Sequence, residues 1–109
     1  MAISKLTTRA AVTVTTGGTP VALFVAPYPK VSKIYLRGDK DNSGDIYVGD
    51  ADVLASTERG AFRLDANVEC IIEAGPTHGG GAGLLNVEDI FVDATSSGDK
   101  VCLSYIEVI

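Results

Sequence analysis

The sequence predicts an all-β fold, a β-sandwich of jelly-roll-like topology with about eight short antiparallel strands. Three observations lead to this fold class. Apolar and polar residues alternate in short runs, which is the period of a half-buried strand. Clusters of Gly, Pro, Asn, Asp and Ser interrupt these runs about every eight to twelve residues. Only residues 53–58 carry a helical period, and that segment is too short for an ordinary α-helix.

Four strands are expected in the first half of the chain, each delimited by turn residues. The first alternates valine with threonine and ends at a Gly-Gly-Thr-Pro turn, and the second ends at Pro-Tyr-Pro. The third places Ile34 and Leu36 on one face between polar neighbours. The fourth does the same with Ile46 and Val48. The four expected ranges are 10–16, 21–26, 31–37 and 45–49.

Four more strands are expected in the second half. One places Phe62 and Leu64 on its apolar face, and the next does the same with Cys70 and Ile72. The Asp-Ile-Phe-Val-Asp run that begins at Asp89 echoes the earlier Asp-Ile-Tyr-Val-Gly-Asp run, which indicates two structurally equivalent strands. The four expected ranges are 61–65, 68–74, 89–93 and 100–108.

The last strand is apolar on both faces. Val101, Leu103 and Tyr105 share one face, whereas Ile106 and Val108 lie on the other. A strand of this kind lies centrally in a sheet or contacts another subunit.

The alternation also selects a hydrophobic core. Burying about a dozen apolar side chains contributes roughly 1.5–3 kcal/mol each before conformational entropy is subtracted, so the chain can fold as a monomer. The selected residues are Val12, Val14, Leu23, Val25, Ile34, Leu36, Ile46, Val48, Phe62, Leu64, Cys70, Ile72, Ile90, Val92, Leu103 and Tyr105.

Length and composition indicate one domain over residues 1–109, with residues 1–9 as an extended N-terminal arm. The chain is 46% hydrophobic and 21% charged, which is typical of a globular protein rather than a disordered one. No apolar run reaches the ~18 residues that span a bilayer, and the N-terminus lacks the apolar core of a signal peptide. We therefore expect a protein that is made and remains in a cytoplasm, with no membrane partner.

The net charge of -5 is distributed unevenly along the chain. Residues 1–38 contain five basic and no acidic side chains, whereas residues 39–109 contain four basic side chains and all 14 acidic ones. Overall acidity argues against general nucleic-acid binding, which depends on clustered Lys and Arg. The basic part either faces an acidic protein partner or is interleaved with the acidic part by the fold.

The segment from Asp39 to Asp50 supports two interpretations. Oxygen-bearing side chains at loop positions 1, 3 and 5, a glycine at 6 and a carboxylate at 12 match the spacing of a calcium loop. However, a calcium loop of this type needs flanking helices, and these flanks alternate as strands, which favours a turn made of ordinary turn residues. The favoured interpretation has no metal and no cofactor. The alternative calcium ligands are Asp39, Asp41, Ser43, Asp45 and Asp50.

Cys70 and Cys102 occur singly inside expected strands. Neither has the spacing of a zinc or redox motif, and His78 is the one histidine of the chain. Two isolated thiols in a cytoplasmic protein are typical of buried small apolar residues, and the alternative is a disulfide that could form if their strands pair.

The run Gly44-Asp45-Ile46-Tyr47-Val48-Gly49-Asp50, the later Asp89-Ile90-Phe91-Val92-Asp93 and the closing strand from Lys100 to Ile109 resemble small virion proteins of tailed bacteriophages. The likeness is to proteins that decorate or cement the outside of the head, and it covers residues 31–65 and 87–109. It implies a β-sandwich or jelly-roll protein, often trimeric, that lies over capsid subunit junctions and stiffens the shell. The implied partners are the major capsid protein and further copies of the chain, and the implied location is the virion head surface.

No motif in the sequence indicates catalysis. The glycine run after His78 is not followed by the Gly-Lys-Ser/Thr of a phosphate loop, and no Gly-x-Ser-x-Gly motif occurs. The pairs Glu69 with Glu73 and Asp89 with Asp93 are spaced as solvated positions of half-buried strands. We therefore expect a structural protein and not an enzyme.

The expected interface combines the threonine-rich arm, which could add to a neighbouring sheet edge, with a tyrosine held between two prolines and the second apolar face of the last strand. Two alternatives remain open, a calcium-binding β module and a phage tail or fibre component. The expected interface residues are Thr7, Thr8, Arg9, Tyr28, Ile106 and Val108.

Overall fold

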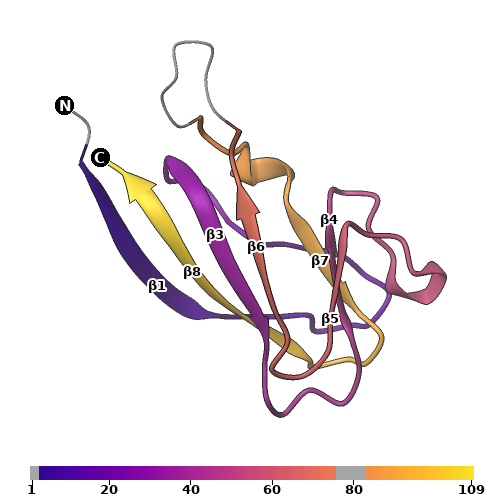
Figure 1. Cartoon of the computed structure of the whole chain (residues 1–109). Helices are drawn as coiled ribbons and strands as arrows, with labels where there is room; N and C mark the ends of the chain where they lie inside the picture. Colours follow the sequence, from indigo (N-terminus) through magenta and orange to yellow (C-terminus); the bar gives the residue numbers. More distant parts are fainter. Residues whose placement is uncertain (1–2, 76–82) are drawn as a thin grey trace.

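The computed structural model, which describes residues 3–75 and 83–109, is a sandwich of two four-stranded antiparallel sheets (Figure 1). The strand order is β1-β8-β3-β6 in the first sheet and β2-β7-β4-β5 in the second. Two short 3-10 turns, η1 (Ala55–Thr57) and η2 (Val87–Asp89), lie in the connections. The strands are β1 (Ser4–Thr13), β2 (Val21–Ala22), β3 (Val31–Gly38), β4 (Ile46–Gly49), β5 (Phe62–Leu64), β6 (Glu69–Glu73), β7 (Phe91–Ala94) and β8 (Lys100–Val108).

The topology is that of a jelly roll. Strand β1 pairs with β8, β2 with β7, β3 with β6 and β4 with β5, all antiparallel. The chain therefore runs as one long hairpin whose turn lies between β4 and β5. Rolling this hairpin brings β3 beside β8 and β4 beside β7, which completes the two sheets. The predicted fold class is thus confirmed.

All eight predicted strands form, and two of them have bounds that differ from the predicted ranges by more than two residues. Strand β1 begins at Ser4, because residues 4–9 pair along β8 within their own sheet. They lie along one margin of the sandwich (Figure 1). Strand β2 contains only two residues, because the chain turns after Ala22 so that both Leu23 and Phe24 enter the core.

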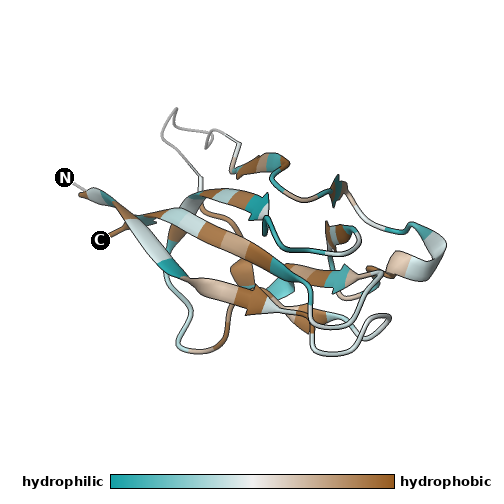
Figure 2. Ribbon diagram, turned by 90° about the horizontal axis from the view of Figure 1, so that it is seen from below, coloured by the Kyte–Doolittle hydropathy of each residue, from teal (hydrophilic) through white to brown (hydrophobic). Residues whose placement is uncertain are grey.

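The core lies between the sheets and contains most of the predicted residues, and the banding of apolar and polar positions along the strands is visible in Figure 2. Two predictions were wrong. Val25 is 68% exposed, since the turn after β2 places Phe24 in the core instead, where its ring contacts Tyr105 edge to face at 5.3 Å. Phe62 is 38% exposed, because β5 is an edge strand beyond which the inner face opens. Within the described ranges, no helix is long or apolar enough to cross a membrane.

Candidate functional site

A connecting segment covers the outer face of one sheet, whereas no described element covers the outer face of the other. On the β2-β7-β4-β5 sheet, Tyr47 and Phe91 point away from the main core and pack against Val53 and Ala55. These last two residues belong to the β4–β5 connection, residues 50–61, which folds back over the sheet. A second small hydrophobic cluster results, and it closes this face.

The outer face of the β1-β8-β3-β6 sheet, in contrast, is uncovered by any other described element and forms the candidate site. Register places most of its outward side chains in three cross-strand rows, and a hollow of about 640 Å³ lies over the second and third of these rows. The middle row is the one with most contact potential, since it combines two hydroxyls with a tyrosine and a half-exposed isoleucine. The rows are Leu6-Ile106-Lys33-Glu73, Thr8-Ser104-Tyr35-Ile71 and Cys102-Arg37-Glu69.

Polar contacts hold the surface of this face in a defined arrangement. The hydroxyls of Thr8 and Ser104 are 3.0 Å apart and share a hydrogen bond. The Lys33 ammonium lies 5.4 Å from the centre of the Tyr35 ring and 4.0 Å from a Glu73 carboxylate oxygen. Such exposed pairs contribute little to stability, but they orient the side chains that a partner would meet.

The predicted interface residues fall into three groups. Thr8, Ile106 and Val108 share the uncovered face. Thr7 and Arg9 point to the opposite side of the same strand, where the Thr7 hydroxyl is buried without a hydrogen bond in the described residues and Arg9 Nε donates to the Tyr105 hydroxyl at 2.7 Å. Tyr28 is 46% exposed in the β2–β3 connection. The structure therefore gathers only part of the predicted set on one surface.

The Asp39 to Asp50 segment is a turn followed by strand β4. The side chain of Asn42 makes two hydrogen bonds with the backbone of Lys100, donating to its carbonyl at 2.7 Å and accepting from its N–H at 2.8 Å. The backbone N–H groups of Ser43 and Gly44 donate to the two carboxylate oxygens of Asp99, at 3.0 and 2.9 Å. The turn is thereby joined to the β7–β8 connection.

The carboxylates proposed as alternative calcium ligands do not converge. Asp39 and Asp50 each accept a hydrogen bond from a backbone N–H two residues later, as in an ordinary Asx turn. Asp45 interacts with Asp65 instead. In residues 3–75 and 83–109, no group of three or more His, Cys, Asp or Glu side chains lies close enough to hold a metal ion.

This arrangement shifts the pKa of the Asp45 carboxyl. A hydrogen bond with the Asp65 carboxyl, and then partial burial, raise the pKa of Asp45 above its ordinary value. Arg63, whose Nε lies 3.9 Å from Asp65 Oδ1, partly opposes this rise. Asp45 therefore binds a proton more readily in the folded chain than a free aspartate does.

Two structurally important carboxylates were not predicted from the sequence. Asp93 is fully buried beneath η1 and accepts hydrogen bonds from the backbone N–H groups of Gly18 at 2.9 Å and Ala55 at 2.8 Å. Its interpretation as a solvated position was wrong, because the β4–β5 connection covers the face on which it lies. Asp99, 5% exposed, holds the Asp39 turn as described. The Ser-Ser-Gly-Asp sequence that contains Asp99 predicted a polar connection. The groups that hydrogen-bond to Asp99 lie far away in the sequence, so they could not be predicted from it.

The cysteines are both free and do not face one another. Strand β3 separates their strands, and register places Cys70 on the core face with Leu36, and Cys102 on the outer face with Arg37. Burial raises the pKa of Cys70 to about 11. Cys102 lies 3.5 Å from an Arg37 guanidinium nitrogen. A disulfide within the chain is therefore excluded in this fold.

Of the residues considered for catalysis, Glu69, Glu73 and Asp89 are exposed, as their spacing predicted. His78 and the glycine run that follows it lie outside the described residues. Comparisons of the chain with protein-family models, with curated proteins and with solved structures each return no match.

Proposed function

We propose that this protein is a structural virion protein that binds the outer surface of an assembled phage capsid and stabilises it, with the major capsid protein as its partner. The bacteriophage resemblance of residues 31–65 and 87–109 supports the biological setting. The uncovered outer face of the β1-β8-β3-β6 sheet is the observation that carries the proposal. A sheet face that a jelly roll leaves open is suited to a flat, repeated surface.

The size and chemistry of this face are adequate for a specific contact. The molecule measures 43 × 24 × 23 Å, so a long face can supply the roughly 800 Å² per partner of a standard interface. Tyr35 and Ile71 lie in its middle row, and the charged residues Lys33, Arg37, Glu69 and Glu73 lie in the rows on either side. An apolar centre with a charged rim is the usual anatomy of a protein interface.

The remaining features fit a stabilising role better than a chemical one. The two best-buried carboxylates, Asp93 and Asp99, are satisfied by backbone N–H groups and hold loops in place. A rigid body that binds several capsid subunits resists their separation. We further propose that it acts as a homotrimer, since three linked copies would bind a symmetric lattice with an avidity that a single copy lacks.

Co-sedimentation with mature capsids tests the proposal. We expect the wild-type protein to sediment with capsids and to raise their resistance to heat or chelator. Arg37→Glu, which reverses a charge on the uncovered face, should weaken binding at least about tenfold by disturbing that face. Lys40→Glu makes a comparable change in the Asp39 turn, outside the three rows of this face, and should alter binding less than about twofold.

Failure of the wild-type protein to co-sediment would overturn the proposal, as would equal losses in the two variants. Immunogold labelling of intact particles separates the two virion locations. Label on the head supports a decoration protein, whereas label confined to the tail or fibres supports the tail alternative instead.

A further inference from the structure

The two opposite margins of the sandwich differ in charge. Strand β1 forms one margin, and strands β5 and β6 form the other (Figure 1). The β1 margin carries Lys5 and Arg9, both exposed, and belongs to the part of the chain that contains no acidic residue. Strand β1 itself is basic, and the cross-strand neighbour of Lys5 on β8 is Glu107.

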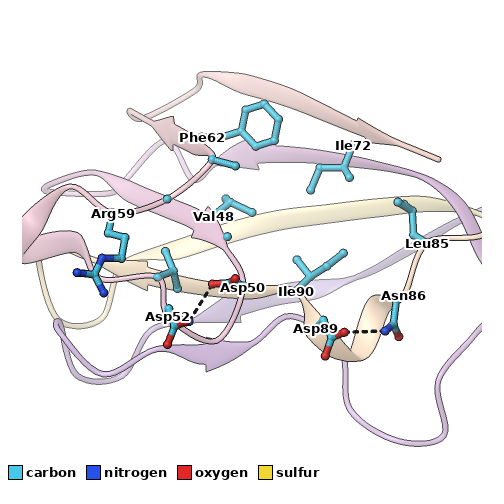
Figure 3. A pocket seen from close by; sticks show the side chains of 14 residues that line it. Val48, Asp50, Asp52, Arg59, Phe62, Ile72, Leu85, Asn86, Asp89 and Ile90 are labelled. Carbon is cyan, nitrogen blue, oxygen red and sulfur yellow. Dashed lines mark hydrogen bonds between the residues drawn. The ribbon is translucent and has the colours of Figure 1, made fainter. Parts of the chain in front are cut away.

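The β5–β6 margin contains a groove of about 720 Å³ that opens between the two sheets. Apolar side chains, among them Phe62, Ile72 and Ile90, line its interior (Figure 3). Three aspartates and one arginine lie around it, so its rim is acidic. The rim residues are Asp50, Asp52, Asp89 and Arg59.

Each margin also ends in a strand with a free backbone edge. In the sheet order, β1 and β6 have a strand neighbour on one side only within the described residues. A register shift between Arg9 and Val12 marks a bulge in β1, so the regular part of this edge is residues 4–9. The β6 edge, Glu69–Glu73, is of similar length. Free edges of this kind favour pairing with another chain.

A second copy placed beside the first satisfies both edges. Strand directions alternate across the β1-β8-β3-β6 sheet, so β1 of a neighbouring copy would continue it antiparallel to β6. In this arrangement, the side chains of the two paired strands divide between the outer and the inner face of the sheet. Leu6, 64% exposed, shares the outer face with Ile71, 50% exposed. Lys5 and Arg9 point to the inner face, the face of Ile72 and of the groove.

The alternative pairing of β1 with its own copy is disfavoured by charge. A two-fold axis at Thr7 would place Lys5 of one copy opposite Arg9 of the other, twice over. Like charges directly opposite one another on paired strands are destabilising. The β1 margin therefore favours the acidic margin of a neighbour over itself.

We propose that the chain associates head to tail, with β1 of one copy paired to β6 of the next and with Lys5 and Arg9 directed at the acidic rim of its groove. The hydrogen bond from Arg9 Nε to Tyr105 and the position of its guanidinium carbon 5.4 Å from the ring centre fix the side chain of Arg9 on the inner face. A head-to-tail interface forms a ring when its rotation closes. This contact deepens the proposed function by naming the surfaces of the homotrimer, but it does not require the capsid.

Sedimentation velocity and light scattering of the isolated full chain test this inference. We expect a species of three times the 11.3 kDa chain mass at about 100 μM protein, and weaker association in 500 mM than in 50 mM salt, because the pairing is partly electrostatic. Lys5→Glu should weaken association at least about tenfold, and Asp52→Lys should do the same from the other margin. The double variant Lys5→Glu/Asp52→Lys should recover it, since the two charges are exchanged.

Lys40→Glu is the matched control, because Lys40 is an exposed lysine in the Asp39 turn and away from both margins. It should change association less than about twofold, and the urea midpoints of all variants should remain close to wild type. A wild-type monomer, a two-fold dimer, or equal losses in Lys5→Glu and Lys40→Glu would overturn the inference. A protein that trimerises without binding capsids supports the inference and removes the proposed function, and a monomer that binds capsids does the reverse.

Discussion

The two sheets of the sandwich present equivalent tyrosines on their outer faces, with opposite consequences. Tyr47 on β4 is 4% exposed, because the β4–β5 connection packs over it. Tyr35 on β3 stands in the same kind of position, and no described element covers it. Both strands alternate in the same way, so strand composition does not distinguish the faces. A connection folded back over one sheet decides which face contributes to folding and which one remains available for binding.

The buried Asp93 carboxylate should contribute more to the stability of the covered face than any other single side chain. Asp93→Ala removes two charge-assisted hydrogen bonds and leaves the N–H groups of Gly18 and Ala55 without an acceptor. We expect a loss of about 4 kcal/mol in the free energy of unfolding. Urea unfolding measures it, with Asp93→Asn, which keeps one acceptor oxygen, as the milder variant. A loss below about 1 kcal/mol would show that the cover does not depend on this carboxylate.

The two tyrosines provide the direct comparison of the faces. Tyr47→Ala should cost about 3 kcal/mol of stability, because it leaves a cavity beneath the β4–β5 connection. Tyr35→Ala should cost about 1 kcal/mol, because its ring is already partly solvated. Thermal and urea unfolding of both variants check the difference. Equal losses would mean that the two faces are equally involved in folding.

The turn that precedes β4 should depend on Asp99 from the β7–β8 connection. Asp99→Ala leaves the backbone N–H groups of Ser43 and Gly44 without their carboxylate acceptor, and we expect a loss of about 2 kcal/mol. The effect is smaller than for Asp93, since water can reach this turn. Hydrogen exchange at the two amides should accelerate in the variant, and unchanged protection would contradict the assignment.

Asp45 should have a small, pH-dependent effect. Its pKa in the folded state lies above the ordinary 3.8, so the folded chain binds this proton more tightly than the unfolded chain does. The contribution of Asp45 to stability is therefore greatest below the ordinary pKa and is lost as the pH rises through the raised folded value. Asp45→Asn should equal or slightly exceed wild type at pH 7, by less than about 0.5 kcal/mol. Unfolding from about pH 3 to 7 measures the sign, and a variant clearly less stable at pH 7 would contradict it.

Calcium should have no measurable effect on stability. The carboxylates of Asp39 and Asp50 accept backbone hydrogen bonds within turns, and Asp45 interacts with Asp65. A ligand raises the melting temperature only if it binds the native state. Scanning calorimetry with and without about 1 mM calcium checks this expectation. A saturable rise in melting temperature would restore the calcium-module alternative.

The strands were predictable because each depends on a local pattern. The alternation around Ile34 and Leu36 places these residues in the core, and the alternation in β8 does the same for Val101, Leu103 and Tyr105. Val25 and Phe24 show where the pattern fails. Continued alternation would bury Val25, but the chain leaves the strand after two residues and exposes it.

The candidate site was predictable only in part. Ile106, Val108 and Thr8 were identified from the last strand and the threonine-rich start, and they share the uncovered face. Tyr35 and Arg37 were not identified from the sequence. The polar face of an amphipathic strand has the same residue pattern whether or not it binds a partner. Only the position of the β4–β5 connection distinguishes this face from the other.

The sequence by itself determined the fold class, the order of the strands along the chain and most of the core, because a two-residue period and turn residues act over a few neighbours. The tertiary structure alone decided which strands pair, that Asp93 is buried while Asp89 is exposed, and that a basic margin lies opposite an acidic groove. These features depend on contacts between residues far apart in the chain, and no local pattern encodes them.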